Sequence, residues 1–214
     1  MTTTPRKRLT AGERRVAIQS SALEVFAERG YHTTSIDDIA RAAGISKALI
    51  YEHFASKQEL HADLLEVQAS ELYRRVASAV EAVEAESGSA RLTAGLEAYL
   101  SFVEERRDAW RVLFRETVDP ESAAALDRVS AQIRALVAAL IAQDPGATPR
   151  DEAHPETDRG IQQLAQMLVG AIQSSANWWD DHREVRRDRV LETAMEFVWF
   201  GLDRLGRGER WAQG

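Results

Sequence analysis

Signals for the start of a helix recur along the chain and constrain its fold more than any other feature. At four places a side chain that accepts hydrogen bonds precedes an acid by two or three residues, as in Thr10–Glu13 and Ser35–Asp38. Such pairs satisfy the unpaired backbone N–H groups at the start of a helix. No stretch alternates apolar and polar residues for long enough to indicate a strand. The sequence therefore predicts an all-α fold of about nine helices.

Glycine, proline and capping residues place the breaks between these helices. Gly30 stands where a left-handed residue would end the first helix. Asp119 followed by Pro120 is a helix start, because proline at the first helical position has no N–H to satisfy. Residues 144–155 hold three prolines and a glycine and form the clearest loop. The expected helices span residues 11–29, 36–43, 47–53, 57–86, 92–107, 108–117, 120–143, 156–181 and 185–205.

The composition excludes several classes of protein. The 214 residues include no cysteine, which rules out a disulfide scaffold, a thiol nucleophile and cysteine-bound zinc. The longest apolar stretch, residues 135–142, is too short to span a bilayer. No apolar run follows the basic residues near the N-terminus, so no secretory signal is expected. We expect a soluble, cytoplasmic protein without a membrane partner.

Charge is distributed unevenly along the chain. The net charge is −7, but residues 1–60 carry nine basic and seven acidic groups, which leaves −9 for the remainder. All the lysines lie in that first segment. A mildly basic head on an acidic body is compatible with nucleic-acid binding, although two units of charge is a weak signal.

Residues 35–54 have the pattern of a helix-turn-helix. Two short helices flank a turn at Gly44, and the small side chains of Ala40 and Ala43 allow them to pack closely at a steep angle. Ile50 and Phe54 share the packed face of the second helix. The opposite face of that helix is then free to enter a DNA major groove.

The residues outside this packed face suit DNA contacts. The N-terminal turn of a recognition helix reaches base edges, and Lys47 can donate there to guanine or to phosphate. Ala48 lets the backbone approach closely, and Lys57 lies in the first turn of the next helix, where an anion is favoured. The predicted DNA-binding residues are Thr34, Ser46, Lys47, Ala48, Tyr51, His53 and Lys57.

Residues 33–60 closely resemble the DNA-binding signature of the TetR family of transcriptional regulators. The features that match are Thr33–Thr34, Ile39–Ala40, Ala43–Ser46, Tyr51, His53–Phe54, Lys57 and Leu60. The resemblance implies a DNA-binding domain at 11–64 and a ligand-binding and dimerisation domain at 65–214. Glu52 departs from the pattern, because an acid on a DNA-facing helix repels phosphate. It either points sideways or accepts from a cytosine amino group.

The resemblance also implies a cavity for an effector in the larger domain. Most apolar residues of its middle helices will form ordinary core, and part of that set is expected to line the cavity. Effectors of the family vary widely, so the sequence does not identify this one. The candidate ligand-binding residues are Tyr99, Phe102, Trp110, Arg111, Phe114 and Trp178.

The last two helices are the expected dimer interface. They carry apolar stripes that include Leu168, Ile172, Met195 and Val198. Such stripes usually form intramolecular core, but in the TetR family the last two helices commonly pair with their symmetry mates. A two-fold homodimer also suits a pseudo-palindromic operator. The basic segment 5–8 is interpreted as a tail, and the alternative is an arm that follows the DNA minor groove.

Taken together, these features predict a ligand-responsive regulator that binds operator DNA. The resemblance implies a repressor that releases DNA when a small apolar or amphipathic effector binds; an activator and a non-promoter interaction module are the alternatives. No enzyme, cofactor or metal site is expected, because the five histidines lack metal-ligand spacing and no glycine-rich phosphate loop is present. Adjacent acids such as Asp180–Asp181 are interpreted as solvated faces or caps.

Overall fold

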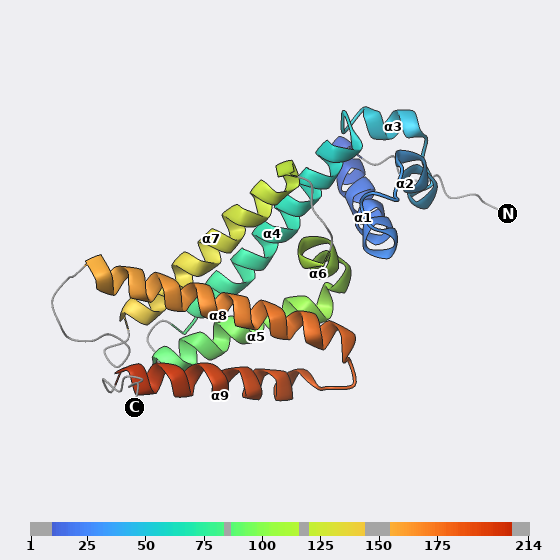
Figure 1. Ribbon diagram of the computed structural model, residues 1–214. Coiled ribbons are helices and arrows are strands. Elements are labelled where there is room, and N and C mark those ends of the chain that lie inside the picture. The colour runs from blue at the N-terminus through green and yellow to red at the C-terminus, as the bar shows by residue number, and fades with distance from the viewer. Residues whose placement is uncertain (1–9, 84–86, 116–119, 144–154, 207–214) are drawn as a thin grey trace.

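The computed structural model describes residues 10–83, 87–115, 120–143 and 155–206 (Figure 1). Within these ranges the chain forms nine α-helices and no strand, which confirms the all-α prediction. The helices are α1 (Ala11–Arg29), α2 (Ile36–Ala43), α3 (Lys47–Tyr51), α4 (Lys57–Glu81), α5 (Gly88–Glu105), α6 (Arg107–Phe114), α7 (Pro120–Gln143), α8 (Pro155–Asp181) and α9 (Arg187–Gly206). None of them combines the length and apolar content that a membrane span requires.

The predicted helix starts after Thr10, Ser35, Ser46 and Ser56 are correct, whereas α5 begins at Gly88 and not at residue 92. The Thr10 hydroxyl accepts from the Glu13 N–H at 3.2 Å, and the Glu13 carboxylate accepts from the Thr10 N–H at 2.7 Å. Ser35 and Asp38 form the same reciprocal pair at α2. The predicted cap at Asp119, the loop at 144–154 and the basic segment 5–8 lie outside the described residues.

Four predicted helix ends are wrong, because α3, α4, α5 and α6 stop at Tyr51, Glu81, Glu105 and Phe114. The helix that follows α4 has its own cap. Ser87 is extended, with ψ 159°, and its hydroxyl accepts from the Ala90 N–H at 3.3 Å. An extended Ser87 cannot belong to α4, so a single helix through this position is excluded.

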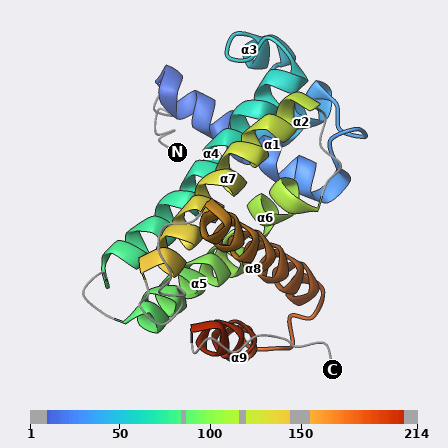
Figure 2. The ribbon, with the colours of Figure 1, turned by 60° about the vertical axis from the view of Figure 1, so that its left-hand side comes forward.

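One long helix connects a small N-terminal unit to the rest of the molecule. Helices α1–α3 lie together at one end, and α4 runs from them into the body, where it packs against α5 and α7 (Figures 1 and 2). Helix α8 packs on α7, and α9 packs on α5. Helix α6 lies between the two parts, in contact with α1, α4 and α5. The apolar core is continuous from Phe26 in α1 to Phe102 in α5, so the two parts share one core.

The turn between α2 and α3 depends on Gly44. This residue has φ 64° and ψ 33°, and the N–H of the following Ile45 donates to the Ala40 carbonyl at 3.0 Å. In this left-handed conformation a side chain would crowd the backbone. Gly44 thus lets the chain reverse and places α3 across α2.

Replacing Gly44 with alanine is expected to lower the free energy of unfolding by about 1–2 kcal/mol, because alanine is strained at positive φ. Urea denaturation followed by circular dichroism measures the change. Gly12→Ala is the matched control, since Gly12 lies in the first turn of α1 with open space around it. Equal stability of the two variants would contradict the strain argument.

Candidate DNA-binding surface and internal cavity

Helix α3 packs on α2 through one buried face, and its opposite face is exposed to solvent. Ile50 is fully buried against α2, and the Ser46 hydroxyl caps the helix by accepting from the Leu49 N–H at 3.2 Å. Lys47, Ala48 and Tyr51 are exposed, and 47% of Tyr51 is accessible to solvent. The structure therefore brings these predicted DNA-binding residues together on one open surface.

Lys47 is already paired with an acid in the free protein. Its ammonium lies 2.8 Å from the carboxylate of Asp37 in α2, and this hydrogen bond raises the pKa of Lys47. Both side chains are about half exposed, so the pair contributes little stability. Lys47 can therefore exchange Asp37 for a phosphate or a base at small cost.

Arg15, which is far from α3 in the sequence, holds the segment at the end of that helix in place. Its guanidinium donates to the His53 carbonyl at 2.9 Å, pairs with the Asp63 carboxylate at 2.8 Å and lies 4.2 Å from the centre of the Phe54 ring. These contacts tie the segment after α3 to both α1 and α4. The sequence analysis missed Arg15 and Asp63, because no local pattern marks partners so far apart in the chain.

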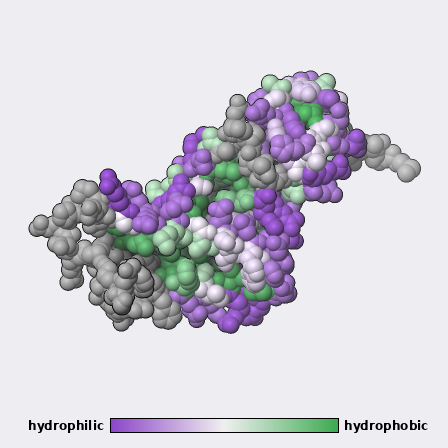
Figure 3. All heavy atoms as spheres, viewed as in Figure 1, coloured by the Kyte–Doolittle hydropathy of each residue, from purple (hydrophilic) through white to green (hydrophobic). Residues whose placement is uncertain are grey.

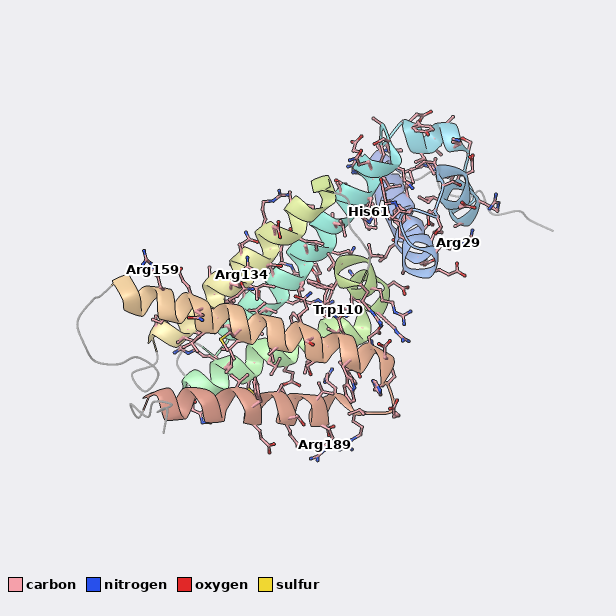
Figure 4. The ribbon with its side chains drawn as sticks, viewed as in Figure 1. Arg29, His61, Trp110, Arg134, Arg159 and Arg189 are labelled. Carbon is pink, nitrogen blue, oxygen red and sulfur yellow. The ribbon has the colours of Figure 1, made fainter. Side chains whose placement is uncertain are left out.

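Thr34 and Lys57 are engaged inside the protein. Thr34 is 2% exposed, and its hydroxyl donates to the Gly30 carbonyl at 2.8 Å. The Lys57 ammonium donates to the carbonyls of Tyr31 and Thr34 at 2.7 and 2.9 Å, and it lies 4.2 Å from the centre of the Tyr31 ring. Both residues brace the connection between α1 and α2, where the Tyr31 ring also packs on His61 of α4 (Figure 4).

An apolar cavity lies between α4, α5, α7, α8 and α9. The cavity is open on one side, and the empty space counted out through that opening, open solvent included, is about 630 Å³. Its lining includes Val76, Leu96, Ile133, Val169, Ile172 and Met195. The predicted dimer stripes of α8 and α9 thus face inward in part, since Leu168, Ile172, Met195 and Val198 all line this cavity.

Of the six predicted ligand-binding residues, the structure places only Tyr99 in the lining of this cavity. Burial raises the pKa of the Tyr99 phenol, which therefore stays neutral. Trp110 is fully buried behind Tyr99, with ring centres 5.4 Å apart, and packs on Phe114 (Figure 4). Phe102 is also fully buried in the core. Trp178 is 50% exposed and stacks on His182, away from the cavity.

Arg111 belongs to a separate cluster around Asp180. This aspartate is completely buried, and Arg107, Arg111, Arg115 and Arg183 place guanidinium nitrogens 2.7–2.9 Å from its carboxylate. The interpretation of this acid as a solvated group is therefore wrong. Three of the arginines recur at four-residue intervals, and that spacing on one helical face was the available signal for a shared carboxylate partner.

The cluster holds Asp180 in its charged form. Burial alone would raise the pKa of this carboxyl, but hydrogen bonds from Arg183, Arg111 and Arg115 outweigh burial and hold the pKa well below its usual range. The folded-state pKa is thus below the unfolded value. The stability that Asp180 contributes is fully present above the unfolded value near 4 and decreases as the pH falls below it.

Replacing Asp180 with asparagine is expected to lower the free energy of unfolding by about 3–5 kcal/mol at neutral pH, because four guanidinium groups lose their shared anion. The deficit relative to the unmodified protein should shrink below about pH 4. Urea titrations from pH 3 to 7 test both expectations. Asp181→Asn is the control: Asp181 is half exposed and pairs with Arg115, so its loss should cost much less than the loss of Asp180. A deficit that grows as the pH falls would contradict the argument.

Comparison with known proteins identifies the family. The family model for bacterial regulatory proteins of the tetR family matches residues 18–64, and a model of the tetracyclin repressor-like C-terminal domain matches residues 89–201. The chain therefore belongs to the TetR family, and it is a helix-turn-helix regulator of transcription. This confirms the resemblance found in residues 33–60.

Individual relatives agree with this assignment over nearly the whole chain. The HTH-type transcriptional activator FasR of Mycolicibacterium smegmatis is 32% identical over 198 residues, which cover 91% of this chain and 85% of FasR. A TetR-like regulator from Rhodococcus sp. RHA1 is 27% identical with a TM-score of 0.76, covering 91% and 98% of the two chains. FadR of Bacillus subtilis, solved in complex with stearoyl-CoA, shares the fold: the TM-score is 0.71 at 17% identity, over 86% and 96%.

Proposed function

We propose that this protein is a homodimeric repressor that binds operator DNA through α3 and releases it when an amphipathic effector enters the cavity. The observation that carries the proposal is that α4 serves both sites. Its N-terminal half holds Lys57 and Asp63, which brace the helix-turn-helix, and its C-terminal half supplies Val76 and Val80 to the cavity wall. The cytoplasm is the proposed location, and no catalytic step is assigned.

Effector binding in the cavity affects DNA binding by changing the direction of α4. An effector between α4, α5 and α7 changes how these helices pack, and α4 transmits the change to α1–α3. Two recognition helices of a dimer must stand about 34–36 Å apart to enter successive major grooves. A coupling free energy of about 1–3 kcal/mol is enough to change operator affinity several-fold or more.

The outward faces of α8 and α9 support the homodimer. Met167 and Trp178 of α8 are 62% and 50% exposed, and Phe197 of α9 is 69% exposed. Gly170 lies between Met167 and Trp178 on α8 with open space around it, so another backbone could approach there. Figure 3 shows hydrophobic side chains interspersed along the side that α8 and α9 present in this view. Exposed apolar faces of this kind mark interaction surfaces.

Activation of transcription is the second candidate, and the identity to FasR favours it, since that relative is described as an activator. Activator and repressor use the same reading helix and the same effector coupling. Transcription in vitro from the bound promoter separates them: a repressor lowers the yield of transcript, and an activator raises it.

Operator binding is tested by fluorescence anisotropy with the purified protein, its own promoter region and a scrambled duplex over a salt series. We expect a preference of about 10³-fold or more for the promoter, with affinity that falls as salt rises. Lys47→Ala should weaken promoter binding by about 1–3 kcal/mol, because Lys47 meets phosphate or guanine. Arg128→Ala is the control, since this exposed arginine on α7 has the same charge and lies in the body.

Two results would overturn the DNA-binding proposal. One is equal, weak binding to every promoter fragment tested, with and without candidate effectors. The other is a Lys47→Ala variant that binds like Arg128→Ala. Addition of effectors to the same complex then tests release, which appears as a fall in anisotropy at constant protein concentration.

The dimer is tested by replacing Phe197 with glutamate. A buried charge is costly, so this variant should sediment as a monomer at concentrations where the unmodified protein is a dimer, and its operator affinity should fall with it. Val67→Glu is the control, because Val67 is 46% exposed on α4. A Phe197→Glu protein that remains dimeric would place the interface elsewhere.

A further inference from the structure

The cavity has one charged end. Among the residues that line it, Arg91 and Tyr99 are the ones with polar side-chain atoms, and the others are apolar or glycine. Arg91 lies in the first turn of α5, and Tyr99 lies about two turns further along the same helix. Arg91 is therefore the one charged residue in the described lining of the cavity.

Arg91 is incompletely paired within the described part of the chain. One guanidinium nitrogen, Nη1, donates to the side-chain oxygen of Gln143 at the end of α7, at 2.9 Å. The Nε atom is buried and has no hydrogen-bond partner. No described carboxylate lies within ion-pair distance of Arg91, whereas the arginines around Asp180 share a buried anion.

This arrangement favours an anion at the end of the cavity. A guanidinium is always charged and presents five N–H donors in a planar fork that matches carboxylate and phosphate oxygens. Burial of a donor without an acceptor is unfavourable, and an anionic group would supply the acceptor. The apolar walls beyond Arg91 offer no partner for a second charged group.

We propose that the effector is a single-chain amphiphile whose anionic head binds Arg91 and whose apolar tail lies among Val76, Leu96, Ile133 and Ile172. The inference rests on the proposed function and names the class of effector for the same cavity. Head groups of this chemistry have two sources, the carboxylate of a free fatty acid and the phosphates of an acyl-CoA. FadR, which has the same fold, was solved in complex with stearoyl-CoA, so a protein of this fold can bind such an amphiphile.

Four probes of one chain length separate the contribution of the head from that of the tail. Dodecanoate, dodecyl phosphate and dodecanoyl-CoA carry anionic heads, and 1-dodecanol has a neutral one. Binding to the full-length protein is measured by calorimetry below the micellar concentration of each probe. We expect at least one anionic probe to bind about tenfold or more tightly than 1-dodecanol, as charged hydrogen bonds imply.

Variants of Arg91 assign this preference to one residue. Arg91→Gln should weaken the anionic probes by about tenfold or more and leave 1-dodecanol within about twofold, while Arg91→Lys should retain part of the preference. Arg134→Gln is the matched control, because Arg134 lies on α7, another helix of the cavity wall, but does not itself line the cavity (Figure 4). Thermal unfolding of each variant identifies any loss of the fold.

The outcomes distinguish this inference from the proposed function. Equal binding of all four probes to the unmodified protein overturns the role of Arg91, even if Arg91→Gln fails to fold, and leaves an effector-responsive repressor intact. No binding of any probe, with operator binding unchanged, overturns the class of effector. A preference for dodecanoyl-CoA that Arg91→Gln abolishes supports the inference and selects the phosphate source, whereas a preference for dodecanoate selects the carboxylate.

Discussion

Burial of α4 along its length is the interaction on which the rest of the structure depends. Leu60, Leu64, Leu65 and Leu72 are at most 1% exposed, and each buried leucine contributes about 1.5–3 kcal/mol. These residues join the core of α1–α3 to the core of the body, so the two parts form one continuous apolar interior. Because a packed interior does not deform smoothly, the proposed function expects a displacement of α4 at the cavity to reach the helix-turn-helix.

Helix α6 provides a second connection between the same two parts. It packs on α1 of the DNA-binding unit and on α4 and α5 of the body. The arginines along and beside it are held by Asp180 at the end of α8. A buried carboxylate with four cationic partners has well-defined geometry, and its disruption leaves several charges uncompensated. The proposed dimer helix α8 is thus linked electrostatically to the element that supports α1, and the core of α4 is not the sole route between the sites.

The sequence predicted what depends on local pattern. Capping pairs such as Thr10–Glu13 gave the helix starts, and the order of motifs in residues 33–60 identified the family. The sequence did not predict contacts between residues that are far apart in the chain. Lys57 carries the charge expected of a phosphate contact, yet its ammonium binds the carbonyls of Tyr31 and Thr34. Most of the cavity lining was missed for the same reason. Aromatic residues such as Trp110 and Phe102 are typical of ligand pockets, but helix packing buries them in the core, and Tyr99 is the candidate that lines the cavity.

The chain places arginines in two different settings, and the difference connects the charged end of the cavity to the transmission of a signal. Around Asp180 the guanidinium groups are neutralised by the protein itself, which suits a permanent link. Arg91 instead donates a hydrogen bond to a neutral group, the side-chain amide oxygen of Gln143. This bond joins α5 to α7. An anion bound to Arg91 competes with this amide for the same donors. Since α5 and α7 both pack on α4, a change at their contact acts directly on the helix that carries the DNA-binding unit.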